Sequence, residues 1–349
     1  MLVLGIETSC DETAVALVED GTTVRANVIG SQVDHHRPYG GVVPEIAARA
    51  HLELLLPVVD AALVEGGCSY DDVDAVAVTI GPGLIGALLV GVAGAKALSL
   101  ARDLPFIGVN HLEAHVCATQ LEFGPVAPPL VGLVVSGGHT SIVLLDRSGT
   151  FATLGATIDD AAGEAFDKIA RFLGLPYPGG PEIDRLARDG DPAAMAFPRA
   201  MLHDGTYDFS LSGLKTAVIR ELRRRDAAGD PVHLPDVAAS FQEALVDVAV
   251  KKTVAAAVAH GVGRVALVGG VAANSRLRAR MAAACEAEGI RLLVPSPALC
   301  TDNGAMVAAA GSNHLAAGER TPLTEQADPN LRLDGVRLPI ALVPPEQAS

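Results

Sequence analysis

Tryptophan is absent from this 349-residue chain, and the other aromatic residues are scarce, with four Tyr and eight Phe. Proteins that hold single-stranded nucleic acid commonly stack its bases on aromatic side chains, so such stacking platforms are few here. Basic residues are also in deficit, because 26 Lys and Arg oppose 41 Asp and Glu and the formal net charge is −15. Phosphate contacts need clustered Lys and Arg, so this excess of acidic residues argues against a protein that binds nucleic acid without a partner. An RNA substrate would need a local basic face or help from partner proteins.

Cysteine is also infrequent, and its pattern indicates free thiols. The five cysteines form no CxxC pair and show no disulfide spacing, which is typical of a reducing compartment. The first apolar run stops at Glu7 without a preceding basic segment, so we expect no secretory signal. Apolar residues 84–95 end before Lys96, which is too short for a bilayer and suits a buried core helix. We therefore expect a cytoplasmic protein with no membrane partner.

A short pattern of strand, polar turn and strand occurs twice. Apolar residues 2–6 and 14–18 flank one polar turn, and residues 130–135 and 141–145 flank another. Two such copies predict a duplicated α/β protein of two lobes with a central cleft, although two hairpins can also resemble each other by chance.

Glycine-rich turns follow three of the predicted strands, at residues 81–83, 136–138 and 269–270. The third turn leads into a helix that begins at Ser275. Glycines at strand ends let backbone N–H groups approach a phosphate, so the three turns favour a nucleotide-type ligand over ordinary tight turns. The residues after Thr324 are rich in Pro, Glu and Gln near the end, and we expect a loosely packed terminus there.

Two histidines, His111 and His115, are four residues apart. In a helix they share one face, with Cβ atoms roughly 5–6 Å apart, a spacing that suits one metal ion and also occurs in histidine pairs on helix surfaces. Glu113 is turned roughly 200° from His111 around a 3.6-residue helix, away from the metal face. Zinc peptidases of the HExxH type carry Glu directly after the first His, so a peptidase interpretation fails.

A third metal ligand must come from elsewhere in the chain, and Asp302 is a candidate. It stands at the start of an Ala-rich segment, where an Asp can equally serve as the N-cap of the helix. Two His and one carboxylate would leave open coordination positions, which suits Fe(II) or Zn(II) as a Lewis acid. Asp167 can accept hydrogen bonds from ribose hydroxyls and Gly180 can let a ligand pass close to the backbone, although a surface charge and a turn are the simpler interpretations.

Eight short strings occur together and in order over about residues 1–325. They are residues 5–13 (GIETSCDET), 40–45 (GGVVPE), 81–84 (GPGL), 111–115 (HLEAH), 136–140 (SGGHT), 163–168 (GEAFDK), 210–216 (SLSGLKT) and 269–274 (GGVAAN). With these strings the chain resembles the bacterial tRNA threonylcarbamoyladenosine transferase subunits, once described as O-sialoglycoprotein endopeptidases. The resemblance implies the duplicated actin/sugar-kinase/Hsp70-like (RNase H-like) fold. We accordingly expect an N-terminal lobe at 1–125, a C-terminal lobe at 126–325 with a possible return to the first lobe near its end, and a tail at 326–349.

The resemblance also implies an activity and its components. Members transfer the threonylcarbamoyl group from threonylcarbamoyl-AMP to the exocyclic amine of adenosine 37 in tRNAs that read codons beginning with A. One divalent metal ion, Fe(II) or else Zn(II), would be held by His111, His115 and Asp302. A paralogous subunit and a small ATPase subunit are the implied protein partners. The implied adenylate-binding residues are Val134, Val135, Ser136, Gly137, Gly138, Asp167, Gly180, Asp184 and Asn274.

Particular residues refine this expectation. Archaeal and eukaryotic relatives carry Tyr where this chain has Val134, and a valine side chain cannot coordinate a metal. A mixed anhydride is already activated, so the enzyme must place it and stabilise charge, and Asp11 is our candidate for helping the adenine amine lose its proton. Basic residues 220–225 and 276–280 are candidate RNA contacts or solvated helix faces.

Two other functions remain open. An ATP-dependent phosphotransferase or carbamoyltransferase of the same fold would use carboxylates for Mg²⁺ rather than a His pair. A non-catalytic scaffold paralogue would be expected to lose the histidines.

Overall fold

The computed structural model describes residues 1–339, which divide into two compact units. Unit 1 contains residues 1–128, 145–152 and 302–339, and unit 2 contains residues 129–144 and 153–301. The chain thus returns to unit 1 at Asp302. This point lies within the segment 126–325, which was predicted as the second lobe with a possible return to the first lobe near its end.

Unit 1 is built on a five-stranded mixed sheet in the order β3-β2-β1-β4-β5. Its strands are β1 (Leu2–Glu7), β2 (Glu12–Glu19), β3 (Thr23–Ser31), β4 (Ala75–Gly81) and β5 (Phe106–Asn110). β1 pairs antiparallel with β2 and parallel with β4, and β4 pairs parallel with β5. The helices are α1 (Val33–His36), α2 (Pro44–Gly66), α3 (Ile85–Arg102), α4 (His111–Cys117), α5 (Gln120–Phe123) and α12 (Gly304–Ala316), with short 3-10 helices η1 (Arg37–Tyr39) and η2 (Tyr70–Asp72).

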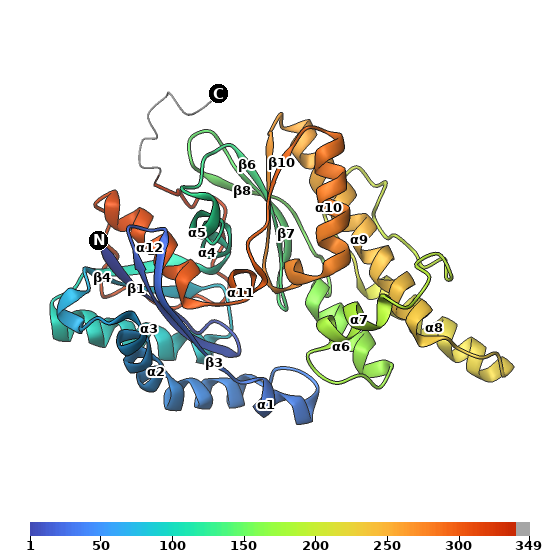
Figure 1. The fold of residues 1–349 in the computed structure, drawn as a ribbon, viewed down its shortest axis with the longest axis horizontal. Helices are drawn as coiled ribbons and strands as arrows, with labels where there is room; N and C mark the ends of the chain where they lie inside the picture. The colour runs from blue at the N-terminus through green and yellow to red at the C-terminus, as the bar shows by residue number, and fades with distance from the viewer. Residues whose placement is uncertain (340–349) are drawn as a thin grey trace. The chain divides into compact units, whose positions relative to one another are not determined.

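Side-chain alternation along β1 assigns its residues to the two faces of the sheet. Leu4 and Ile6 enter the hydrophobic core beside α2. Gly5 faces α12, because a Cβ at this position would lie only 2.4 Å from the Ala308 amide nitrogen. Residues two apart in a strand share a face, so Glu7, at the end of β1, lies on the α12 side. Figure 1 shows α12 on one face of this sheet and α2 and α3 on the other.

Helix α3 differs from its prediction as a buried core helix. It has 18 residues with a mean hydropathy of 1.5, and only a third of it is buried. Its buried face includes Leu88 and Val92, whereas Leu89 and Leu100 are exposed. By length and composition alone α3 could cross a membrane. A single such helix is weak evidence for a membrane span, because one face of α3 packs in the core of unit 1.

Unit 2 carries most of a second five-stranded sheet, in the order β10-β9-β6-β7-β8. Its strands are β6 (Leu130–Val135), β7 (Thr140–Leu145), β8 (Phe151–Ala156), β9 (Arg264–Val268) and β10 (Arg291–Leu293). Read from the opposite end, this order repeats that of the first sheet, with β6, β7 and β8 in the places of β1, β2 and β3. β6 and β9 are parallel, as are β1 and β4. The predicted duplicated α/β architecture is confirmed.

The helices of unit 2 pack in two hydrophobic clusters. These helices are α6 (Ala162–Phe172), α7 (Gly179–Ala187), α8 (Ser212–Ala228), α9 (Leu234–Ala259), α10 (Ser275–Ala287) and α11 (Pro297–Cys300), with the 3-10 helix η3 (Gly270–Ala273). One cluster joins the sheet to α9 and α10. The other joins α6, α7, α8 and α9, where the rings of Phe166 and Phe241 pack edge to face at 5.3 Å. This packing fixes the starts of α6, α7 and α10.

Residues 326–339 pack against unit 1 rather than forming the expected loose terminus. The side chains of Leu333 and Leu338 are buried. The backbone amide of Phe151 donates to the carbonyl of Val336, and that of Leu338 donates to the carbonyl of Gly149. The rest of the predicted tail, 340–349, lies outside the described residues.

Candidate functional site

Helix α4 presents both histidines from one face, as the four-residue spacing predicted. It begins directly after β5, where the Asn110 side chain caps it by accepting from the amides of Leu112 (2.9 Å) and Glu113 (3.4 Å). The His111 and His115 rings are 4.6 Å apart between centroids at an interplanar angle of 75°. The cap and the spacing together therefore place two imidazoles side by side at the carboxyl end of the edge strand β5.

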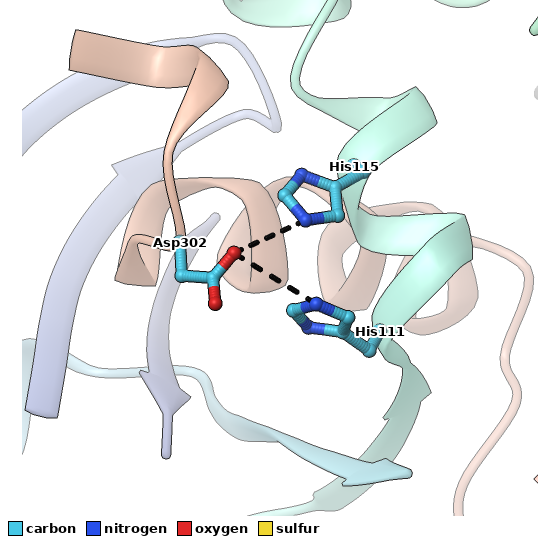
Figure 2. Close-up of side chains that lie close together, drawn as sticks. All are labelled: His111, His115 and Asp302. Carbon is cyan, nitrogen blue, oxygen red and sulfur yellow. Dashed lines mark ion pairs between the residues drawn. The ribbon is translucent and has the colours of Figure 1, made fainter. Parts of the chain in front are cut away.

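Asp302 reaches the same point from the start of α12. The cap of that helix is Asn303, whose side chain accepts from the Met306 amide at 3.1 Å, so the alternative that Asp302 is the N-cap is wrong. Figure 2 shows the Asp302 carboxylate directed at the two imidazoles. Its Oδ1 lies 3.2 Å from His115 Nε2 and 3.8 Å from His111 Nε2.

The three side chains fit a metal ion. Their candidate ligand atoms all lie within 4.8 Å of one another. His115 is completely buried, and within residues 1–339 neither of its ring nitrogens has a hydrogen-bond partner, although Nε2 lies within ion-pair distance of Asp302 Oδ1. Buried polar nitrogens are rarely left without a partner, and a metal ion facing Nε2 would supply one. Two imidazoles and a carboxylate suit a divalent transition metal.

Charge balance at this cluster also favours a cation. Burial alone lowers the pKa of His111, but the carboxylates of Glu7 and Asp302 outweigh burial and raise it to about 9. Burial raises the pKa of Glu7, yet the charge and hydrogen bond of His111 leave it lowered overall. The carboxylates therefore attract positive charge, which a proton or a metal ion can provide.

Glu113 points away from the metal cluster, as predicted. Its Oε1 lies 2.8 Å from Nε2 of His314, whose Nδ1 lies 2.6 Å from Oε2 of Glu319. Glu113 therefore ties α4 to α12, and it does not adopt the position of a zinc-peptidase base.

Two carboxyl groups with raised pKa values lie side by side in the chain where the turn after β1 leads into β2: Asp11 in the turn and Glu12 at the start of β2. Burial raises the pKa of Asp11, a hydrogen bond with Cys10 lowers it, and the charge of Asp302 raises it again. Burial raises the pKa of Glu12 to about 7, although the hydroxyl of Ser31 donates to its Oε1 at 2.9 Å. Sequence reasoning missed Glu12, because no pattern within residues 5–13 distinguishes it from Asp11.

Unit 2 contains a separate cavity of about 410 Å³, formed by the glycine-rich turns and by the starts of α6 and α7. Its lining residues are Gly137, Gly163, Phe166, Asp167, Tyr177, Pro178, Gly180, Pro181, Asp184, Arg188, Gly270, Val271, Ala273, Asn274 and Thr301. Five of the nine expected adenylate-binding residues are in this lining: Gly137, Asp167, Gly180, Asp184 and Asn274.

Three of these five also hold the cavity together. An Asp167 oxygen accepts from the Gly179 amide at 2.7 Å, and an Asp184 oxygen accepts from the Ser275 hydroxyl at 2.8 Å. Asn274 caps α10 by accepting from the Leu277 amide at 2.9 Å.

The other four expected residues are not in the cavity lining. Val134 and Val135 are buried in β6. The hydroxyl of Ser136 accepts from the His139 amide at 3.2 Å, and Gly138 is exposed. Sequence reasoning did not single out Phe166, Tyr177, Arg188 or Thr301, because a lining role depends on tertiary placement. Phe166 did lie within one of the strings that marked this region, residues 163–168 (GEAFDK).

Two kinds of glycine surround this cavity. A Cβ on Gly163 would lie 2.8 Å from the Gly137 Cα, and one on Gly179 would lie 2.4 Å from the Ala170 Cβ. These glycines permit close packing of the chain. A Cβ on Gly137 would meet no protein atom within 4 Å, and one on Gly180 would meet its nearest at 4.0 Å. The space above these two glycines is therefore open to a ligand.

Comparison with known proteins places the chain in a family. The family model for tRNA N6-adenosine threonylcarbamoyltransferase matches residues 23–309. A tRNA N6-adenosine threonylcarbamoyltransferase of Geobacter metallireducens is 55% identical over 337 residues, which is 97% of this chain and 98% of that protein. The protein of the same name from Symbiobacterium thermophilum is 56% identical over 332 residues, which is 95% of this chain and 97% of that protein.

Solved structures support the fold. HypF of T. kodakarensis aligns with a TM-score of 0.60 and 16% identity, covering 91% of this chain and 48% of its own. An activator of 2-hydroxyisocaproyl-CoA dehydratase from Clostridium difficile aligns with a TM-score of 0.54 and 16% identity, covering 91% and 97%. Both share the actin/Hsp70-like ATPase fold predicted from the sequence. With the match over most of its length, the chain is a tRNA-modifying transferase with tRNA as a substrate, and it belongs to the tRNA N6-adenosine threonylcarbamoyltransferase family.

Proposed function

We propose that this chain transfers the threonylcarbamoyl group of threonylcarbamoyl-AMP to the exocyclic amine of adenosine 37, in tRNAs that read codons beginning with A. The observation that carries the proposal is the intact cluster of His111, His115 and Asp302 in a member of this family. In the reaction the amine nitrogen attacks the carbamoyl carbon, the carbon–oxygen bond to AMP breaks, and AMP leaves with the bonding electrons. The amine also loses one proton.

The cluster in unit 1 is the proposed metal site, with Fe(II) as the proposed ion and Zn(II) as the alternative. An ion bound there would act as a Lewis acid toward the acyl group. His111 and His115 would contribute Nε2 and Asp302 would contribute Oδ1, since these atoms face one another. Asp11 is the proposed acceptor of the amine proton, because burial and the charge of Asp302 raise its pKa above the ordinary value of an aspartate and so make it a stronger base.

The cavity in unit 2 is the proposed adenylate site. Its volume of about 410 Å³ is within the range of small-molecule pockets. Gly137 and Gly180 leave open space beside the backbone, and the Asp167 carboxylate can accept from ribose hydroxyls. The proposed adenylate-binding set remains Val134, Val135, Ser136, Gly137, Gly138, Asp167, Gly180, Asp184 and Asn274.

The proposed partners are a paralogous subunit and a small ATPase subunit. Exposed apolar side chains on α2 and α3, two helices that pack together, support a protein partner. Each of them is more than half exposed: Leu52, Leu56, Val64, Leu89 and Leu100. Apolar side chains that gather on a surface commonly mark protein interfaces. The proposed compartment is the cytoplasm, which suits the five free cysteines.

Reconstitution tests the proposal. The chain is incubated with its partner subunits, threonylcarbamoyl-AMP and tRNA, and the nucleosides are analysed by mass spectrometry. Elemental analysis of the purified chain gives its metal content. We expect the wild-type chain to form threonylcarbamoyladenosine and to hold one metal ion, and the His111→Ala, His115→Ala double variant to lose both.

The matched control is the His203→Ala, His233→Ala double variant, which removes two exposed histidines of unit 2. It should retain both metal and activity. Equal metal content in the wild-type and His111/His115 variants would contradict the metal site. Absence of the modified nucleoside with the complete wild-type system would contradict the function.

A further inference from the structure

A buried carboxylate behind the metal cluster has no role in the function proposed above. Glu7 ends β1, and none of its surface is exposed. We propose that Glu7 is a positioning residue that holds His111 by Nδ1 and so directs Nε2 of the same ring toward the metal. This inference rests on the metal site of the proposed function.

Three groups converge on the two oxygens of Glu7. Its Oε2 lies 2.7 Å from the Thr79 hydroxyl, which donates to it, and 3.1 Å from His111 Nδ1. Its Oε1 accepts from the Ser9 amide at 2.5 Å. An ionised carboxylate is the side chain that only accepts hydrogen bonds, whereas Gln would turn two N–H groups toward this set. The surroundings of Glu7 therefore select a carboxylate.

The bond to Glu7 determines which nitrogen of His111 can bind a metal. A neutral imidazole carries one N–H, and a carboxylate partner retains that proton on the nitrogen it contacts. With the proton on Nδ1, the lone pair of Nε2 is directed to the side where Asp302 Oδ1 lies, 3.8 Å away. The Ser9 hydroxyl, 3.2 Å from His111 Nδ1, is the competing partner of that nitrogen.

The two histidines of the cluster differ in what lies beside Nδ1 of the ring. Nδ1 of His111 faces a carboxylate, whereas Nδ1 of His115 is buried without a hydrogen-bond partner among residues 1–339. Two adjacent strands hold Glu7, because it ends β1 and its partner Thr79 lies in β4. His111 is thus the ligand whose orientation the sheet prepares before a metal binds.

Metal affinity tests this role without relying on catalysis. Zn(II) binding to the metal-free chain is measured by competition with a chromogenic chelator, and Co(II) binding by its visible spectrum. Loss of a residue that orients a metal ligand typically weakens metal binding roughly 10–100-fold, and we expect this loss for Glu7→Gln with an altered Co(II) spectrum. Glu7→Asp, which restores an acceptor-only group, should recover part of the affinity.

The matched control is Glu113→Gln. Glu113 is another buried carboxyl of unit 1 that bonds a histidine, but that histidine, His314, is not in the metal cluster. This variant should bind Zn(II) as the wild type does. Circular dichroism and AMP binding by unit 2 verify that each variant is folded.

The outcomes separate the inference from the proposed function. A wild-type chain that binds no metal would overturn the metal site, whereas equal Zn(II) affinity in wild type and Glu7→Gln would overturn only the role of Glu7. If Glu7→Gln does not fold, ¹⁵N NMR of the His111 ring in the Zn(II)-loaded wild type shows which ring nitrogen binds zinc and which carries the proton. A protonated Nδ1 with zinc on Nε2 supports the inference, and zinc on Nδ1 contradicts it.

Discussion

At the scale of single residues, the open glycine of the unit 2 cavity provides a direct test of the adenylate site. A Cβ on Gly137 would meet no protein atom within 4 Å, so the Gly137→Val side chain should occupy ligand space without disturbing the fold. We expect this variant to retain its melting temperature and to lose about tenfold or more in AMP affinity, measured by calorimetry, because the added side chain displaces the ligand.

Two neighbouring glycines serve as comparisons for this prediction. Gly163→Ala should destabilise the chain, since its Cβ would lie 2.8 Å from backbone atoms of Ser136 and Gly137. Gly138→Val tests another glycine of the proposed set, where a Cβ would also meet no protein atom within 4 Å but which lies outside the cavity lining. An equal loss of affinity at Gly137 and Gly138 would support both members of the proposed set, a loss at Gly137 alone would remove Gly138 from it, and unchanged AMP affinity in Gly137→Val would place the nucleotide elsewhere.

Local spacing made some site residues predictable and left others hidden. His111 and His115 could be paired because a helix brings residues four apart onto one face. Glu7 could not be linked to His111, since the two are 104 positions apart and meet only when β1, β4 and β5 align. Asp302 was ambiguous between ligand and cap until Asn303 proved to be the cap. Contacts within one helix can be read from a sequence, whereas contacts between strands depend on the complete sheet.

At the scale of elements, the pair of Glu113 and His314 joins α4 to α12, the helices on either side of the metal cluster. Burial lowers the pKa of His314, but hydrogen bonds and charge from Glu113 and Glu319 raise it to about 9. Because this pKa exceeds that of the unfolded chain, the contribution to stability is complete below about pH 6.5 and is lost as pH rises through about 9.

Urea unfolding of the metal-free chain between pH 6 and pH 10 measures this contribution. We expect His314→Gln to be destabilised by on the order of 1–3 kcal/mol at pH 6, with the difference from wild type shrinking toward pH 10. His203→Gln, an exposed control on unit 2, should match wild type at every pH. A difference that does not change with pH would show that the Glu113–His314 pair is not ionic.

Helix and strand positions were predictable where apolar runs are bounded by glycine. The strand at residues 130–135 and the helix start at Ser275 coincide with β6 and α10. The segment 326–339 was misjudged because backbone hydrogen bonds, such as that of Leu338 to Gly149, leave no mark on composition. The burial of α3 was also overestimated, because a run of apolar residues does not show which of its faces packs.

At the scale of the whole molecule, a net charge of −15 must be reconciled with a tRNA substrate. The basic run 276–280 is largely neutralised, because Arg276 and Arg280 form ion pairs with Glu243. In the run on α8, Arg224 and Arg225 bond to Glu221 and lower its pKa to about 2, and Arg223 is exposed. The α8 run therefore remains the preferred RNA contact, with further positive surface expected from partner subunits.

Replacing Arg223, Arg224 and Arg225 together with Glu tests this contact. Each phosphate contact that is lost reduces the slope of log affinity against log salt by about one. We therefore expect weaker tRNA binding by the complex with partner subunits, a shallower salt dependence and reduced transfer at moderate salt, while AMP binding by unit 2 is unchanged. The same charge change at three exposed arginines elsewhere, Arg25, Arg147 and Arg337, controls for net charge. If both triple variants lose tRNA affinity equally, the effect is only that of total charge, and if neither loses it, the α8 run is a solvated helix face and tRNA binds elsewhere.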